Sequence, residues 1–156
     1  MTREKATFNK NILLAVDDSE NSARAVAYTG QILAGGLDYQ ITLLHIIPEP
    51  EEDFFPSRRD QQRWLARYRK KMAVLLEDYR KVLMAHGLAA GDVKVAIKLR
   101  SCPSLAECIL KERESSGCDT IVVGRQGLSR SEEFLFGSIS SKIVTHADRC
   151  TVWVVG

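Results

Sequence analysis

Short apolar runs alternate with longer amphipathic segments along the whole chain, and this alternation constrains the fold more than any other feature. Continuous runs of Val, Ile and Leu are typical of strands that are buried on both faces, and alternating runs of strands with one wet face. The predicted strands lie at residues 11–16, 40–47, 93–99, 118–123 and 150–155. The segments between them predict helices at about 20–34, 60–86, 104–115 and 138–147. Strands and helices in alternation predict an α/β three-layer sandwich with a five-stranded parallel sheet.

Residues 93–99 indicate an edge strand, and residues 48–59 indicate a long loop after the second strand. Residues 93–99 alternate between apolar and polar side chains, so one face of this strand is partly wet, which suits an edge position. Pro48 stops the second strand, and residues 48–59 contain three prolines and four acids. That composition predicts a long loop, which can act as a lid.

Length and charge exclude several classes of protein. We expect one domain over residues 1–156, with residues 1–9 as an N-terminal tail. The net charge of +2 comes from interspersed acids and bases, so no basic block supports binding to nucleic acid. No apolar stretch has the length of a membrane-spanning helix, and the charged start does not resemble a signal peptide. We therefore expect a cytoplasmic protein without a membrane partner.

The cysteines have none of the paired short spacings of a zinc site; they are Cys102, Cys108, Cys118 and Cys150. In a cytosolic protein we expect them to be reduced and mostly buried. Cys102 lies near a predicted helix start, where a thiol can become more reactive, so a redox role stays open as an alternative.

The glycines after the fourth strand carry the strongest functional signal. The sequence runs Gly124-Arg-Gln-Gly127, then nine residues, then Gly137-Ser138 at the start of the last predicted helix. Backbone N–H groups at a helix start have no intrahelical partner and can bind an oxyanion such as phosphate. Glycine leaves the backbone open to a ligand because no Cβ stands in the way. The alternative is that these glycines only form turns and that Ser138 is an ordinary N-cap.

Polar residues also follow the carboxyl ends of other strands. If the strand order is 3-2-1-4-5, strands one and four flank a crevice where the order reverses, and ligands of such sheets bind there. Asp17 ends the first strand and Ile46 lies at the end of the second. Asp17 can also be a turn residue only, and His45 is more typical of a core histidine than of a catalytic one. The predicted site therefore gathers at one edge of the sheet.

These motifs resemble the universal stress protein family, in its ATP-binding branch, from Asn11 to Val155. The glycine pattern matches the nucleotide-binding signature of that family at every defined position. Residues 16–22 (Val-Asp-Asp-Ser-Glu-Asn-Ser) resemble its first-strand turn, 43–46 (Leu-Leu-His-Ile) its second strand, and 137–147 its last helix. The resemblance implies a Rossmann-like sandwich of the adenine nucleotide alpha hydrolase-like type, with the sheet order 3-2-1-4-5.

The resemblance also implies where an adenine nucleotide binds. Asp17 would bind the ribose or adenine end, and the backbone of Ile46 would pair with the adenine edge. Amides around Gly127, Gly137 and Ser138, with the Ser138 hydroxyl, would hold the phosphates. Neighbouring positions expected to line the pocket are Val16, Val123, Gly124, Gln126, Ile139 and Ser140. Mg²⁺ would arrive with the phosphates of ATP.

The implied function is an ATP-binding stress-response or signalling module with slow or no hydrolysis. No residue is spaced as a general base, and the sequence has no Walker loop. An enzyme of the same sandwich, which hydrolyses ATP or adenylates a substrate, stays as an alternative because phosphoryl transfer needs mainly positioning and a metal. A second alternative is an interaction protein of the family that binds no nucleotide. The apolar final strand, Thr151 to Val155, predicts a homodimer because an uncovered edge strand invites pairing.

Overall fold

The predicted strands form one parallel sheet in the order β3-β2-β1-β4-β5, which confirms the predicted topology. The computed structural model describes residues 7–125 and 138–156. The strands of this part are β1 (Asn11–Ala15), β2 (Gln40–Pro48), β3 (Val93–Arg100), β4 (Thr120–Gly124) and β5 (Thr151–Val155). Its helices are α1 (Glu20–Leu33), α2 (Arg58–Ala85), α3 (Leu105–Ser116) and α4 (Ser138–His146), with a short 3₁₀ turn at Ala90–Asp92. None of these helices combines the length and the apolar character that a membrane span needs.

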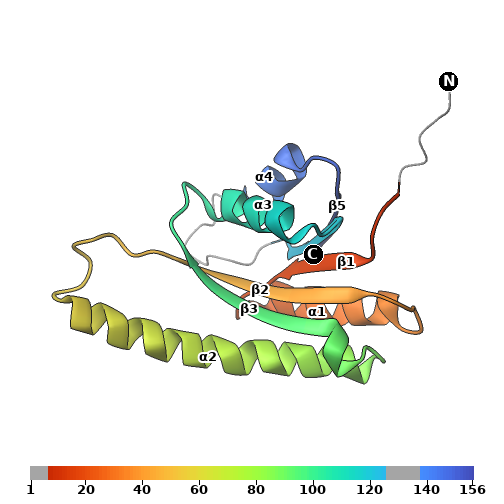
Figure 1. Cartoon of the computed structure of the whole chain (residues 1–156), viewed down its shortest axis with the longest axis horizontal. Coiled ribbons are helices and arrows are strands. Elements are labelled where there is room, and N and C mark those ends of the chain that lie inside the picture. The colour runs from red at the N-terminus through yellow and green to blue at the C-terminus, as the bar shows by residue number, and fades with distance from the viewer. Residues whose placement is uncertain (1–6, 126–137) are drawn as a thin grey trace.

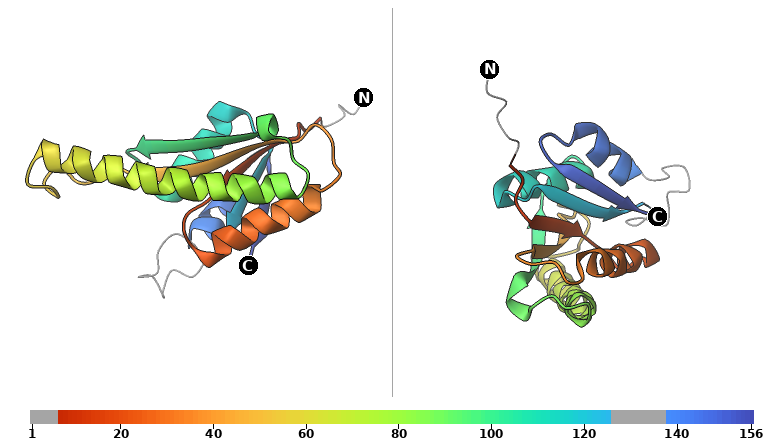
Figure 2. Two further views of the ribbon diagram at one scale, coloured as in Figure 1. Left: turned by 90° about the horizontal axis from the view of Figure 1, so that it is seen from below. Right: turned by 90° about the vertical axis from the view of Figure 1, so that its right-hand side faces the viewer.

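The helices cover the sheet in two layers. α1 and α2 lie against one face, and α3 and α4 lie against the other (Figure 1 and Figure 2). In β1, Leu14 packs into the core under α1 and α2, while Leu13 packs into the core under α3 and α4. The central strand thus contributes to two cores, as a continuous apolar run predicts.

Side-chain caps explain where two helices begin. Ser57 Oγ accepts a hydrogen bond from the Asp60 amide at 3.1 Å, so α2 begins at Arg58, ahead of the predicted start. Asp60 is an acid of the first turn and not the first helical residue. Ser104 Oγ accepts from the Glu107 amide at 3.2 Å, which confirms the predicted cap of α3. The other predicted boundaries lie within about two residues of the observed ones.

The two edges of the sheet differ in how they are covered. β3 is an edge strand, as its alternating sequence predicts, and two arginines of α2 reach it. Arg69 Nη1 donates to the Ile97 carbonyl at 3.3 Å, and Arg80 Nε donates to the Val93 carbonyl at 3.2 Å. At the opposite edge, no side chain of the described residues donates to a carbonyl of β5. Within the described residues, therefore, side chains cover the β3 edge of the sheet, and none donates to the β5 edge.

The expectation that all the cysteines are reduced is wrong for one pair. Cys102 and Cys108 form a disulfide between the loop after β3 and the first turn of α3. The loop turns back over the helix start and brings the two Cα atoms to 5.8 Å, within the range that a disulfide requires. Cys118 and Cys150 have free thiols, and burial raises the pKa of Cys150. Sequence spacing does not reveal the pairing because it depends on the path of the loop.

Candidate functional site

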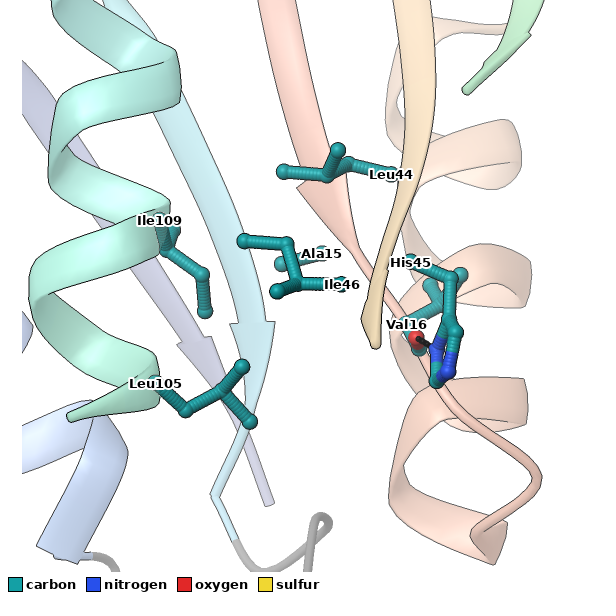
Figure 3. Close-up of a pocket in the computed structure, with 7 residues that line it drawn as sticks. All are labelled: Ala15, Val16, Leu44, His45, Ile46, Leu105 and Ile109. Atoms are coloured by element: carbon teal, nitrogen blue, oxygen red, sulfur yellow. Dashed lines mark hydrogen bonds between the residues drawn. The ribbon is translucent and has the colours of Figure 1, made fainter. Parts of the chain in front are cut away.

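The carboxyl ends of β1 and β2 meet α3 at a small apolar cavity (Figure 3). Its lining residues are Ala15, Val16, Leu44, His45, Ile46, Leu105 and Ile109. Figure 3 shows Leu105 and Ile109 of α3 facing Ala15 and Ile46 of the strands. The cavity measures about 10 Å³, close to the space that one water molecule needs. Two predicted site residues, Val16 and Ile46, therefore share one pocket.

β4 brings two more predicted residues to the same edge. Val123 is buried in the core cluster that also contains Ala15 and Ile46. Gly124 ends β4, and a Cβ on it would lie 2.9 Å from the backbone carbonyl carbon of Asn21 in α1. Such an approach is too close for a real Cβ, so glycine lets β4 pack against α1. The structure thus gives Gly124 a packing role, and the approach of a ligand that the sequence indicates stays a prediction.

Asp17 lies directly beyond β1, and its own turn holds it in place. Its carboxylate oxygen Oδ1 accepts from the Ser19 amide at 2.9 Å and from the Ser22 hydroxyl at 2.8 Å. The residue is only 7% exposed. Among the described residues no donor reaches Oδ2, so this oxygen can accept from a ligand hydroxyl. The two roles that the sequence left open, turn former and ligand acceptor, are therefore compatible.

His45 is a satisfied core histidine, which confirms the sequence interpretation. Its Nδ1 lies 2.7 Å from the Val16 carbonyl oxygen, and its Nε2 lies 2.9 Å from the Tyr68 hydroxyl. Because a carbonyl can only accept, Nδ1 carries the proton and Nε2 accepts from Tyr68. Burial raises the pKa of Tyr68, and the charges of Asp18 and Asp17 add to the effect. His45 thus joins the ends of β1 and β2 and keeps neither nitrogen for proton transfer.

Sequence reasoning missed the contribution of a second tyrosine. Tyr79 of α2 donates its hydroxyl to the Asp17 carbonyl at 2.7 Å. Burial, with the charges of Asp17 and Asp18, raises the pKa of Tyr79 to about 12, so the hydroxyl stays protonated. The sequence indicated no site role for Tyr68 or Tyr79. The signal was that a buried tyrosine hydroxyl needs a polar partner.

The start of α4 lies beside the exit of β4. The structure describes α4 from Ser138 onward, directly after the residues that it does not describe, so the alternative of an ordinary N-cap at Ser138 stays a prediction. Ser140 is buried, and its hydroxyl donates to the Arg125 carbonyl at 3.5 Å. Ile139 packs against the core under α3 and α4. The remaining predicted site residues, Gln126, Gly127 and Gly137, lie outside the described residues.

Comparison with known sequences points to one family. The sequence model of the universal stress protein family matches residues 9–156. A protein of Staphylococcus haemolyticus that carries the name of this family is 31% identical over 146 residues, covering 94% of this chain and 84% of the relative.

Solved structures share the fold. Universal stress protein UspA from Lactobacillus plantarum has a TM-score of 0.78 at 20% identity, over 96% of this chain and 99% of that chain. A universal stress protein in complex with cAMP has a TM-score of 0.65 at 19% identity, over 96% and 98% of the two chains. One from Archaeoglobus fulgidus in complex with dAMP has a TM-score of 0.63 at 14% identity, over 96% and 98%. With the family match over nearly its whole length, this chain belongs to the universal stress protein family.

Proposed function

We propose that this chain binds an adenine nucleotide, in the form of ATP, where β1, β2 and β4 end, and that it acts as a stress-response or signalling module. The observation that carries the proposal is an apolar cavity at the carboxyl ends of β1 and β2, with the buried residue Asp17 following β1, next to the β1–β4 pair where the sheet order reverses. Ligands of open α/β sheets bind outside the carboxyl ends of the strands at such a point.

The backbone of Ile46 supports binding of the base. β1 ends at Ala15, which is in register with Leu44, and the Val16 amide donates to the Leu44 carbonyl at 2.9 Å. Backbone groups point to alternate sides along a strand, so those of Ile46 face the β1 side beyond the last residue pair. They are in position to pair with the polar edge of adenine. The apolar side chain of Ile46 would contact its ring.

The sugar would lie at Asp17, and the phosphates would lie at the start of α4. Asp17 Oδ2 would accept from a ribose hydroxyl. The first amides of α4, at Ser138, Ile139 and Ser140, would donate to phosphate oxygens. The sequence pattern adds Gln126, Gly127 and Gly137 to this phosphate site, next to Val123 and Gly124 at the end of β4.

Mg²⁺ fits this arrangement as an ion that the phosphates carry. Within residues 7–125 and 138–156, no three His, Cys, Asp or Glu side chains gather into a possible metal site. We therefore propose that the phosphates supply the ligands of the ion, which would neutralise part of their charge. 

The ligands of two relatives support adenine as the base. Universal stress proteins of similar fold have been solved with cAMP and with dAMP, both of which contain adenine. We propose ATP as the form that binds here because the glycine pattern after β4, followed by the start of α4, is a sequence signature of phosphate binding.

We propose that hydrolysis is slow or absent. Among the residues that the structure describes, two side chains near the cavity could act as a general base, and both are engaged. His45 uses both ring nitrogens in hydrogen bonds. Asp17 Oδ1 accepts two hydrogen bonds, and Oδ2 is assigned to the ribose end, away from the phosphates.

We also propose a homodimer through β5. Thr151 N donates to the Asp119 carbonyl, and the Val155 carbonyl accepts from Arg125 N, so these two residues face β4. By alternation, the backbone groups of Val152 and Val154 face outward. The Val154 side chain is 41% exposed. A groove of about 600 Å³, lined in part by Tyr28 and Trp153, lies beside this edge. A second copy could add its own β5 in antiparallel orientation and fill the groove.

Calorimetric titration with ATP, ADP, AMP and cAMP tests the nucleotide proposal. Asp17→Asn keeps an oxygen for the bonds from Ser19 and Ser22 but removes the acceptor at Oδ2. A hydrogen bond to a charged acceptor is worth about 1.5–3 kcal/mol, so the affinity should fall roughly 10- to 150-fold. Asp18→Asn is the matched control because the Asp18 side chain is 69% exposed. A folded wild type that binds none of the four nucleotides refutes the proposal.

A further inference from the structure

The Cys102–Cys108 disulfide ties the loop after β3 to the first turn of α3, the helix that forms one wall of the cavity described above. It encloses the residues that lead into α3, including Leu105, whose side chain lines the cavity. Ile109, the next residue after Cys108, lines the cavity as well. The position of both side chains therefore depends on how the first turn of α3 is held.

The two sulfur atoms differ in their access to solvent. Cys108 is 4% exposed and belongs to the core under α3 and α4. Cys102 lies in the loop between β3 and α3 and is partly exposed. An exposed sulfur bonded to a buried one suits attack by an external thiolate at the exposed atom.

We propose that Cys102 and Cys108 form a reversible dithiol–disulfide site that controls access to the nucleotide cavity, with low-molecular-weight thiols of the glutathione type as its redox partners. This inference rests on the proposed function. The disulfide form holds Leu105 against the strands and binds nucleotide weakly. The dithiol form frees the first turn of α3 and binds nucleotide tightly.

The reaction is thiol–disulfide exchange. A thiolate attacks the sulfur of Cys102, the bond between the two protein sulfurs breaks, and the sulfur of Cys108 leaves as a thiolate that takes up a proton. A second thiolate attacks the external sulfur of the mixed disulfide and releases Cys102 as a thiolate. The two external thiols are thereby oxidised to one disulfide, and the protein disulfide is reduced to two thiols. The reverse sequence, with an external disulfide as the oxidant, restores the bond.

The size of the cavity gives the direction of the effect. At about 10 Å³ it is far smaller than the roughly 300–1,000 Å³ of typical ligand sites, so a purine needs one wall to move. On the strand side, Ala15 and Leu44 are in register in the paired interior of the sheet. On the helix side, Leu105 is the first residue of α3, held by the Ser104 cap and by the disulfide. The helix side is the wall that reduction can loosen.

Titration of ATP into two forms of the wild type tests the inference. One sample is oxidised with glutathione disulfide, the other is reduced with a phosphine, and mass spectrometry after thiol alkylation verifies each state. The reduced form should bind ATP at least about fivefold more tightly, within the range of ordinary coupling between sites. Cys102→Ser should bind like the reduced form under both conditions. Cys150→Ser, which removes a free thiol, should keep the difference between the two forms.

A second variant tests the route of the coupling. Leu105→Ala should raise the affinity of the disulfide form to that of the reduced wild type, because it opens the same wall without reduction. Equal ATP affinity of both wild-type forms overturns this inference and leaves the nucleotide proposal intact. Absence of binding in both forms overturns the two together. A disulfide that does not form and break in glutathione buffers overturns the inference whatever the affinities are.

Discussion

Replacing Glu112 by glutamine tests how α3, one wall of the cavity, is fixed to the edge strand β3. Glu112 Oε2 accepts from Lys98 Nζ at 2.7 Å, and Oε1 accepts from Arg100 Nε at 3.1 Å. The Glu112 side chain is 11% exposed, whereas the side chains of the two cations are 38% and 46% exposed. A nearly buried carboxylate thus lies between two cations that keep much of their hydration.

The expected loss of stability follows from this asymmetry. A hydrogen bond to a charged group contributes about 1.5–3 kcal/mol. Glutamine keeps one acceptor oxygen, and the half-exposed cations can turn to water, so the loss lies near the lower end of that range. We expect Glu112→Gln to lower the free energy of unfolding at pH 7 by about 1–2 kcal/mol. For a domain of this size that corresponds to a fall of roughly 2–8 °C in Tm.

The pH dependence gives the prediction a second signature. Burial alone would raise the pKa of Glu112, but hydrogen bonds and charges from Lys98 and Arg100 outweigh it and hold the pKa below its usual value. A carboxyl whose pKa is lowered by folding stabilises the protein above its unfolded pKa of about 4.3. That contribution is lost as the pH falls through the folded pKa. The difference between wild type and variant should therefore be full at pH 7 and should shrink below about pH 4.3.

Urea unfolding at a series of pH values measures both effects. Glu114→Gln is the matched control because Glu114 is an exposed residue of the same helix, so its effect should stay within about 0.5 kcal/mol. Equal unfolding midpoints for wild type and Glu112→Gln at pH 7 would refute the reasoning. So would a difference that persists unchanged into strong acid.

Three further predictions concern packing, turnover and assembly. Gly124→Ala should destabilise the protein by about 1–3 kcal/mol in urea unfolding because its Cβ would overlap Asn21. Gly91→Ala is the control and should be nearly neutral, because a Cβ at that position meets no atom within 4 Å. Equal losses of stability in the two variants would contradict the packing role of Gly124. Phosphate release from ATP with Mg²⁺ should stay below about 1 per second, and a faster rate that Asp17→Ala abolishes would favour an enzyme. Light scattering should give twice the chain mass of 17.5 kDa for the wild type. Val154→Pro should give the mass of a single chain, because it removes an outward N–H of β5 and leaves the hydrogen bonds to β4 intact. A monomeric wild type would rule the dimer out.

The sheet was predictable from sequence because its signal is local. Each strand is a short apolar run, and the alternation of polar and apolar residues in 93–99 identified an edge strand that the topology confirms. Side-chain partners were less predictable because they join segments far apart in sequence. The bond from Tyr79 to Asp17 spans 62 positions, and the Cys102–Cys108 pair depends on how one loop turns. Gly124 stays a predicted site residue, and its close approach to Asn21 in α1 could not be predicted because it joins segments about 100 positions apart.

At the carboxyl ends of the strands, α2 is attached to the sheet by hydrogen bonds and α3 by apolar packing. This difference decides which helix can move when a ligand binds. On the α2 side, the hydroxyls of Tyr68 and Tyr79 bind His45 and the Asp17 carbonyl, so moving that helix would break buried hydrogen bonds. Each such bond costs about 1–3 kcal/mol to leave unmade. On the α3 side, the cavity wall consists of the apolar side chains Leu105 and Ile109, whose rearrangement breaks no hydrogen bond. Polar contacts therefore fix the residues that would recognise the nucleotide, while the wall that must yield to it is apolar.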